Sequence, residues 1–392
     1  MARYIRKIII KNKLLASALC IVSLVSCGNQ QSQPDTWQTA IDKLARQELT
    51  HTGLPSLQIA IGHKGEIVFE NAYGYANIKS KTRATLQTQY RTASISKWFT
   101  GTATLKLVEQ DKINLDEPIQ AYCPAYPPKP WPVTTRQLLS HTAGVRHYAD
   151  FKSMRAKAKT KDERINVEAW IKHAKSGQAK RYTDVIAPLE IFKDDDLMFE
   201  PGMGWGYSSF GYRVLACVMR GAADKPYREI VRSLVFDPAA MEKTRDDDTL
   251  ANIPDRATLY SLVAKGKIKL APNRDVSENL PAGGHLSTAS DLVKFAQVYD
   301  MGLLVSPNSI EIMSSLPTAK NGETLEVGYG HGVDFMGAFP GSLGHGGRQA
   351  GTTTLLILLP EKDISIAVMT NANGWGDING FTQKILDIYN QT

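Results

Sequence analysis

The sequence predicts an α/β domain built from both ends of the mature chain, with a mostly helical region inserted between them. From Leu57 to Phe69, apolar and polar residues alternate around the turn Lys64-Gly65, which is typical of a β-hairpin. Two further strand patterns flank a Pro-Glu-Lys-Asp turn near the C-terminus, at 354–359 and 364–369. Helical patterns occupy 98–110, 167–174, 210–222, 227–234, 289–299 and 381–389. We therefore expect an α/β part at about 36–100 and 280–392, and a helical insertion at about 101–279.

The N-terminus has the pattern of a secretory signal. A basic stretch precedes the apolar run Leu14 to Val25, which at about 12 residues is shorter than the roughly 20 that span a bilayer. The run ends Leu24-Val25-Ser26-Cys27, which resembles the lipobox of bacterial lipoproteins; an ordinary signal with an incidental cysteine is the alternative. We expect a signal peptide at 1–26, lipid attachment at Cys27, a polar tether at 27–35 and a catalytic domain at 36–392. This predicts a lipid-anchored membrane protein of the bacterial cell envelope, facing the periplasm or the exterior.

The net charge does not indicate a nucleic-acid partner. The chain has 46 Lys and Arg against 39 Asp and Glu. Five of the basic residues lie in 1–26, so 46 − 5 = 41 basic residues remain against 39 acidic ones. Nucleic-acid binding needs concentrated positive charge, which this balance lacks.

Four cysteines are present, and two of them remain beyond the proposed anchor: Cys123 and Cys217. An extracytoplasmic compartment would permit a disulfide between them. However, Cys217 lies in an apolar run, which favours a buried free thiol, and the pairing stays open. No Cys/His spacing or His-Glu-x-x-His pattern indicates a metal site, and we expect no metal or organic cofactor.

A candidate nucleophile stands where a helical pattern begins. In Ser94-Ile95-Ser96-Lys97, the hydroxyl of Ser94 and the amine of Lys97 share a helix face. A buried lysine can lose its charge and activate a serine hydroxyl, and a helix N-terminus can stabilise an oxyanion. Alone, the pattern is also that of a capping serine followed by a surface lysine.

Two later segments add candidate groups. Tyr207 lies at a loop-to-helix junction, where its phenol could act as a base if nearby cations lowered its pKa. Otherwise it is a buried structural donor. The glycine-rich run 344–348 lies directly before a strand and lets a substrate approach backbone N–H groups, although a plain β-turn is the alternative.

In this order, the three segments resemble the Ser-x-x-Lys, Tyr-x-Asn and Lys-Thr-Gly motifs of serine β-lactamases and penicillin-binding proteins, of the class C type. The resemblance covers about residues 40–390, with further matching runs at 115–118, 138–145 and 282–288. Runs 141–148 and 207–212 are most similar to the mitochondrial serine β-lactamase-like branch of the family, which includes a peptidase. The resemblance implies an antiparallel sheet flanked by helices. We expect His141 to be structural within its loop.

The resemblance also implies catalytic roles. Ser94 is the acylated nucleophile, Lys97 its proton partner, and Tyr207 the general base and then acid. The backbone N–H groups of Ser94 and Arg348 form the oxyanion hole.

The substrate-binding positions depart from the family pattern. Ser209 replaces the asparagine that touches the acyl-side amide of the substrate. His345-Gly346-Gly347 replaces Lys-Thr-Gly, so a permanent cation and a hydroxyl are missing. Because a histidine with a pKa near 6.5 is charged only in mild acid, both changes lower the expected efficiency towards β-lactams.

We therefore expect a serine hydrolase that forms a covalent acyl-serine intermediate on small peptide or ester substrates in the cell envelope. One alternative is a DD-carboxypeptidase or β-lactamase acting on cell-wall-derived or penicillin-like compounds. Another is a non-catalytic envelope sensor or assembly protein that keeps the fold. The sequence leaves the exact substrate and the oligomeric state open.

Overall fold

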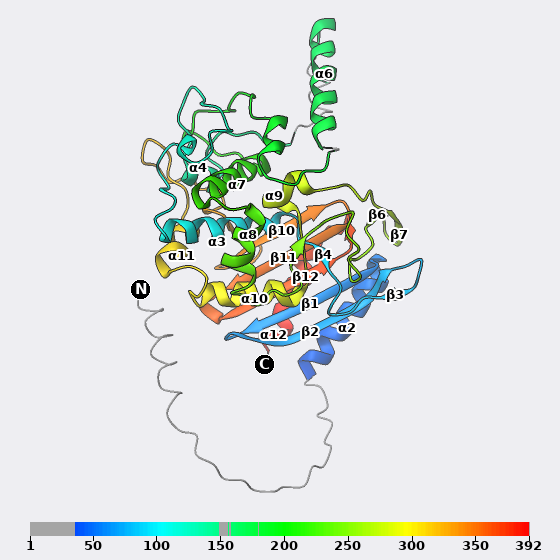
Figure 1. The fold of residues 1–392 in the computed structure, drawn as a ribbon. Coiled ribbons are helices and arrows are strands. Elements are labelled where there is room, and N and C mark those ends of the chain that lie inside the picture. The colour runs from blue at the N-terminus through cyan, green and yellow to red at the C-terminus, as the bar shows by residue number, and fades with distance from the viewer. Residues whose placement is uncertain (1–35, 149–155, 157, 179, 392) are drawn as a thin grey trace, which may run out of the picture.

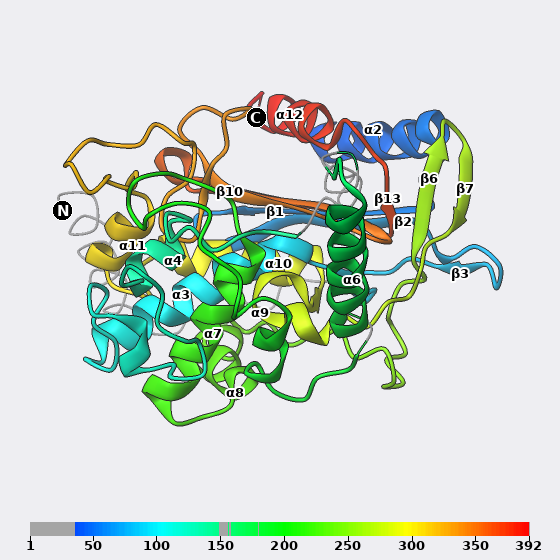
Figure 2. The same cartoon turned by 90° about the horizontal axis from the view of Figure 1, so that it is seen from above.

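The computed structural model describes residues 36–148, 156, 158–178 and 180–391. The expected signal peptide at 1–26 and the tether at 27–35 with Cys27 lie outside the described residues. Helices cover both faces of one seven-stranded sheet (Figures 1 and 2). Every strand pair in this sheet is antiparallel, so the predicted fold class is confirmed.

The two ends of the chain meet in the centre of the sheet. Its strand order is β3-β2-β1-β12-β11-β10-β9. The strands are β1 (Ser56–His63), β2 (Glu66–Asn77), β3 (Thr82–Arg83), β9 (Asp334–Phe335), β10 (Leu343–Gln349), β11 (Thr352–Leu359) and β12 (Ile364–Thr370). β1 pairs with β12 from Gln58 opposite Met369 to His63 opposite Ile364. The N-terminal hairpin and the C-terminal strand pair, both predicted, are thus parts of one sheet.

Side chains of the central strands alternate between two apolar cores. On β1, Leu57, Ile59 and Ile61 point to one face and join the core against the terminal helices. On β11, Leu356 and Leu358 point to the opposite face and join the larger core against the helical region. Because successive side chains on a strand point to opposite faces, a central strand covered on both sides is apolar throughout.

The helices form a layer on each face of the sheet. α2 (Thr36–Thr52) and α12 (Ile378–Tyr389) pack together on one face, and α10 (Ala289–Asp300) packs on the other (Figure 2). The remaining α-helices are α3 (Ser96–Glu109), α4 (Thr135–Leu139), α6 (Lys161–Gln178), α7 (Ser209–Ala223), α8 (Tyr227–Val231), α9 (Leu280–Gly283) and α11 (Pro307–Met313). α6 projects away from the body of the protein (Figure 1). Along the described stretches, no helix is long and apolar enough to cross a membrane.

The inserted region is not entirely helical. It contains the hairpin β6 (Tyr260–Ala264) and β7 (Lys267–Leu270), and β6 pairs with β13 (Ala372–Asn373). A second small sheet joins β4 (Tyr90–Arg91), β8 (His285–Ser287) and β5 (Arg245–Asp246). These strands are short and mostly exposed or paired across long sequence distances, so no alternating pattern marks them.

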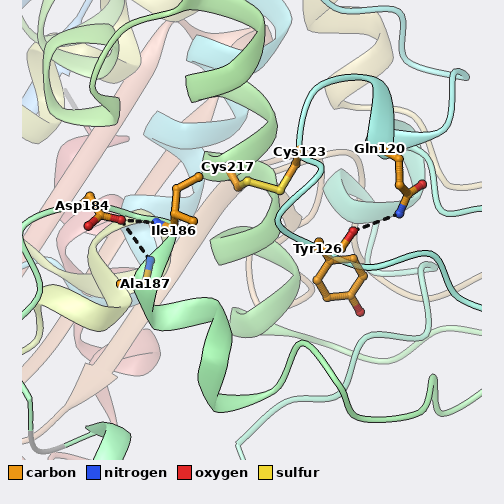
Figure 3. Close-up of a disulfide and its surroundings, with 7 residues drawn as sticks. All are labelled: Gln120, Cys123, Tyr126, Asp184, Ile186, Ala187 and Cys217. Atoms are coloured by element: carbon orange, nitrogen blue, oxygen red, sulfur yellow. Dashed lines mark hydrogen bonds between the residues drawn. A yellow bond between two sulfur atoms is a disulfide. The ribbon is translucent and has the colours of Figure 1, made fainter.

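The expectation of a free thiol at Cys217 is wrong, because Cys217 forms a disulfide with Cys123 (Figure 3). Their Cα atoms are 5.5 Å apart, and the bridge links α7 to the turn after the 3₁₀-helix Ile119–Ala121. Both side chains are buried. The apolar run around Cys217 is the buried face of α7, and it does not distinguish a thiol from a half-cystine.

We expect Cys217→Ser to lower the free energy of unfolding by roughly 2–5 kcal/mol, because the bridge closes a loop of 94 residues in the unfolded chain. Thermal denaturation with and without a reductant measures this. The reductant should lower the Tm of the wild type and leave that of the variant unchanged. Recovery of unlinked Cys123 and Cys217 peptides from the non-reduced protein would contradict the disulfide.

Candidate active site

Ser94 lies in a strained turn at the edge of the sheet. The 3₁₀-turn Ala93–Ile95 precedes α3, which begins at Ser96 rather than at the nucleophile as predicted. Ala93 has φ +46°, a left-handed conformation that costs a residue other than glycine roughly 1 kcal/mol. Ser94 is half-exposed, while its neighbours on both sides are buried. The turn therefore holds the Ser94 hydroxyl at the surface of a cleft.

Lys97 lies directly beneath this hydroxyl. Its Nζ is 3.2 Å from Ser94 Oγ and 2.9 Å from the carbonyl oxygen of Ala282. The pKa of Lys97 is lowered to about 7, mainly by burial; the charge of Asp334 opposes this shift and that of Arg213 adds to it. A large fraction of Lys97 is thus an uncharged amine near neutral pH, which can accept a proton from Ser94.

Tyr207 completes the group. It directly precedes the N-cap of α7, its ring lies 4.8 Å from Lys97 Nζ, and its hydroxyl shares a hydrogen bond with Ser94. Burial raises the pKa of Tyr207 well above 10. The hypothesis that nearby cations lower this pKa is therefore wrong, and Tyr207 is a protonated phenol that can donate.

Two histidines hold the start of α7. His141 Nδ1 accepts a hydrogen bond from the backbone N–H of Ser208 at 3.1 Å, and His147 Nδ1 accepts one from Ser209 at 3.0 Å. Their rings pack on Tyr207, with centroids 4.5 and 5.4 Å away. Burial lowers the pKa of both, that of His147 to about 4, so both rings are neutral and can accept. These contacts fit the structural role expected for His141.

The glycine-rich run does precede a strand, β11, as predicted, but it is itself strand β10 rather than a turn or loop. β10 pairs with β11 along its whole length, with His345 opposite Leu356. A Cβ on Gly347 would lie 2.3 Å from the carbonyl oxygen of Thr92, so only glycine permits this approach to the Ser94 turn. A Cβ on Gly346 would meet no heavy atom within 4 Å.

His345 is buried and uncharged. Its Nδ1 lies 2.7 Å from the carbonyl oxygen of Gly346, which can only accept, so Nδ1 carries the proton. The pKa of His345 is lowered to about 3, mainly by burial and in smaller part by the nearby Lys97. Asp334 Oδ2 lies 3.5 Å from His345 Nδ1, and burial raises the pKa of the Asp334 carboxyl well above its usual range. The expected charging of His345 in mild acid is therefore wrong.

The cleft above Ser94 has a volume of about 500 Å³. Of the sequence-predicted positions, it is lined by Ser94, Tyr207, Ser209, His345, Gly346 and Arg348. Lys97 and Gly347 lie beneath it. Sequence reasoning missed Tyr148, Asn279, Tyr329 and Asp334 in the lining. Asn279 stands just before a run that resembles the family, which was the available signal, whereas nothing in the pattern marks Tyr329 or Asp334.

Ser209 is engaged by the protein itself. Its hydroxyl hydrogen-bonds the Tyr148 phenol, and its backbone N–H donates to His147. In the described residues, no group of three or more acidic, histidine or cysteine side chains is arranged to hold a metal ion. The absence of a metal site and of a cofactor stays a prediction.

The chain matches the family model described as Beta-lactamase over residues 41–386. It belongs to the beta-lactamase family. The mitochondrial serine beta-lactamase-like protein of Homo sapiens is 30% identical to this family member over 307 residues, which are 65% of this chain and 56% of that protein. The chain thus spans a little over half the length of this relative.

Solved structures of low sequence identity share the fold of this beta-lactamase-family protein. The octameric penicillin-binding protein homologue from Pyrococcus abyssi gives a TM-score of 0.70 at 22% identity, covering 90% of this chain and 77% of that one. The D-amino acid amidase from Ochrobactrum anthropi SV3, complexed with L-phenylalanine, gives 0.70 at 23%, covering 91% and 98%. At these identities, the likeness concerns the fold alone.

We expect the rate at which a neutral fluorophosphonate acylates Ser94 to rise with pH through about 7 and then to level off. The reason is that the neutral amine of Lys97 is the proton acceptor, and its protonated fraction falls across this range. Intact mass spectrometry at fixed times from pH 5 to 9 measures the rate. Lys97→Arg, which keeps the charge and cannot lose it, should react slowly with no inflection near 7. An inflection near 10 in the wild type would contradict the lowered pKa.

Proposed function

We propose that the protein is a hydrolase that forms an acyl ester on Ser94 and acts on peptide or ester substrates. The observation that carries this proposal is the 3.2 Å approach of a buried lysine amine, with a pKa of about 7, to Ser94 Oγ. A serine hydroxyl needs such a base to become a nucleophile near neutral pH. Membership of the beta-lactamase family supports the same chemistry.

In the first half-reaction, Lys97 accepts the proton of Ser94 as Oγ bonds to the substrate carbonyl carbon. The carbonyl oxygen becomes an oxyanion that the backbone N–H groups of Ser94 and Arg348 stabilise. Tyr207 then donates its proton to the leaving nitrogen or oxygen as that bond breaks, and Lys97 returns the proton to Tyr207. This assigns to Lys97 the proton uptake that the resemblance gave to Tyr207.

In the second half-reaction, water replaces the leaving group. The neutral amine of Lys97 takes one proton from the water as the water oxygen bonds to the acyl carbon, and it later passes this proton to Ser94 Oγ. The bond from that carbon to Ser94 Oγ breaks, Ser94 regains a proton, and a carboxylic acid leaves the cleft. The two neutral histidines at α7 take no part in proton transfer; they hold Tyr207 within reach of Ser94.

The chemistry of β10 favours uncharged substrates. His345 is neutral at neutral pH and Gly346 has no hydroxyl, so this strand lacks the cation and donor that would bind a penicillin or D-alanine carboxylate. A carboxylate would depend on Arg348, which is exposed and three residues farther along the strand. A peptide or ester without that carboxylate does not need the missing cation and hydroxyl in order to bind.

We also propose that the protein is anchored in the bacterial cell envelope. The disulfide between Cys123 and Cys217 supports an oxidising compartment, because such bonds are rare in the cytosol. The signal-like pattern before Cys27 supports export and lipidation. An anchored hydrolase of this kind would meet small peptides or esters at the membrane surface.

Treatment with a fluorophosphonate should add one adduct, mapped to Ser94, and Ser94→Ala should lower kcat/KM for an ester by several orders of magnitude. The residual rate comes from substrate binding and the oxyanion hole. Mass mapping and steady-state kinetics measure the two effects.

Ser96→Ala is the matched control. Ser96 is buried and its hydroxyl bonds Thr92 Oγ1 at 2.9 Å, so its loss should leave the Ser94 adduct in place. An adduct on Ser96, or full activity in Ser94→Ala, would refute the assignment.

Cells that produce the full chain should incorporate labelled palmitate into the wild type and not into Cys27→Ala, because the thiol of Cys27 is the proposed attachment point. Fluorography of the immunoprecipitated protein measures the label. Cys20→Ala, which removes the other cysteine of the N-terminal segment, should label as the wild type does. If Cys27→Ala incorporated as much label as the wild type, lipid attachment at Cys27 would be refuted.

A further inference from the structure

A side-chain amide lies in the cleft beside the Ser94 turn. Asn279 ends the short 3₁₀-helix Ser277–Asn279 and occupies the N-cap position of α9 without a side-chain capping bond. It lines the cleft together with Ser94 and Ser209, and its exposed fraction is 8%. None of the proton transfers described above uses this amide.

A buried arginine fixes the orientation of this amide. Arg213 Nε lies 3.4 Å from Asn279 Oδ1. A guanidinium has only donors, so the oxygen of the amide must face Arg213 and the nitrogen must point elsewhere. Arg213 lies one helical turn after Ser209 on α7, is 1% exposed, and stacks 4.5 Å above the Phe210 ring.

Arg213 is itself held in place from the far side. Its guanidinium forms an ion pair with Glu278 at 3.6 Å, next to Asn279 in the chain. The same short segment therefore supplies both the acid and the amide that contact Arg213. Because Arg213 and Glu278 are both nearly fully buried, neither side chain can move without leaving the charge of the other buried and unpaired.

The amide nitrogen and the residue that precedes the nucleophile both pack against Gly283. A Cβ on Gly283 would lie 2.9 Å from Asn279 Nδ2 and 3.5 Å from the carbonyl carbon of Ala93. Gly283 thus leaves the space that Nδ2 occupies beside the Ser94 turn. In the part of the chain that the structure describes, Arg213 is the one side-chain hydrogen-bond partner of Asn279.

We propose that Asn279 Nδ2 donates a hydrogen bond to a carbonyl oxygen in the acyl part of the substrate, next to the scissile carbonyl. The inference rests on the proposed acyl-serine function. Tyr207 hydrogen-bonds Ser94 and protonates the leaving group, whereas Asn279 lies by Ala93, so the donor faces the acyl part. Ser209 is already bonded to Tyr148, which leaves Asn279 to meet this oxygen. The cleft thereby selects acyl groups that carry an amide, as peptides do, over plain alkanoyl groups.

Two 4-nitrophenyl esters with the same leaving group test this inference on the detergent-solubilised full chain. The N-acetylglycine ester carries an amide carbonyl in its acyl part, and the butanoate ester carries none. Asn279→Ala should lower kcat/KM for the N-acetylglycine ester about tenfold and leave that for butanoate within about twofold, since one hydrogen bond is lost. Fluorophosphonate labelling of Ser94 should persist in the variant.

Asn279→Asp is a second variant that keeps an oxygen facing Arg213 and replaces the donor by an acceptor. It should lower the ratio of kcat/KM for the N-acetylglycine ester to that for the butanoate ester at least as much as Asn279→Ala does. The added negative charge affects both neutral esters alike, so it does not change this ratio. Asn273→Ala is the matched control, because Asn273 also accepts from an arginine, Arg256, at 2.7 Å, but lies exposed outside the cleft. It should leave both esters unchanged.

An unchanged ratio in both Asn279 variants, or equal losses for the two esters, would overturn the role of Asn279 while Ser94 labelling upholds the proposed function. Failure of the wild type to label at Ser94 and to hydrolyse either ester would overturn the proposed function, and this inference with it.

Discussion

The site depends on the close approach of strand β10 to the turn that carries Ser94. Gly347 lies so near Thr92 that a single added carbon would stand 2.3 Å from a carbonyl oxygen. Ala93 adopts a left-handed conformation against the same strand, where its Cβ would be 3.2 Å from a Cβ on Gly347. Packing of the sheet against the inserted helices supplies the free energy that holds this strain. The cleft therefore lies where the two parts of the chain meet.

Burial sets the electrostatics of the cleft more than any ion pair does. Lys97, His345 and His141 are buried and Tyr207 is partly buried, and in each case burial is the largest cause of the pKa shift. The shifts all favour the uncharged form, as expected for a low-dielectric site. Lys97 alone moves close to neutral pH, so it can exchange a proton there while the others stay fixed. A site whose buried groups are neutral and hold one exchangeable proton suits acyl groups that carry no charge.

The sequence predicted the elements whose pattern is local. The hairpin from Leu57 and the strands at 354–359 and 364–369 alternate or run apolar, and the spacing of Ser94 and Lys97 reports one helical turn. β10 was missed because Gly344, Gly346 and Gly347 carry no side-chain pattern. The strand is specified by its pairing with β11 and by close contacts that leave no room for a Cβ at Gly344 and Gly347. The disulfide and the pKa shifts of His345 and Tyr207 depend on which distant segments come to lie together. Such contacts leave no periodic trace in a single sequence.

Helix α7 connects these observations, because one side of it serves the cleft and another anchors the fold. At its start, Ser208 caps the helix by accepting from Gly211 and donating to the carbonyl oxygen of Arg146, which places Tyr207 just before the first turn. One turn beyond Ser209, Arg213 holds the amide of Asn279. One turn further, Cys217 is tied to Cys123. A helix fixed at successive turns cannot slide or rotate without breaking a covalent bond or leaving a buried charge unpaired. The proton donor and the proposed substrate-reading amide thus keep a constant separation, which a cleft needs if it is to distinguish acyl groups by a single hydrogen bond.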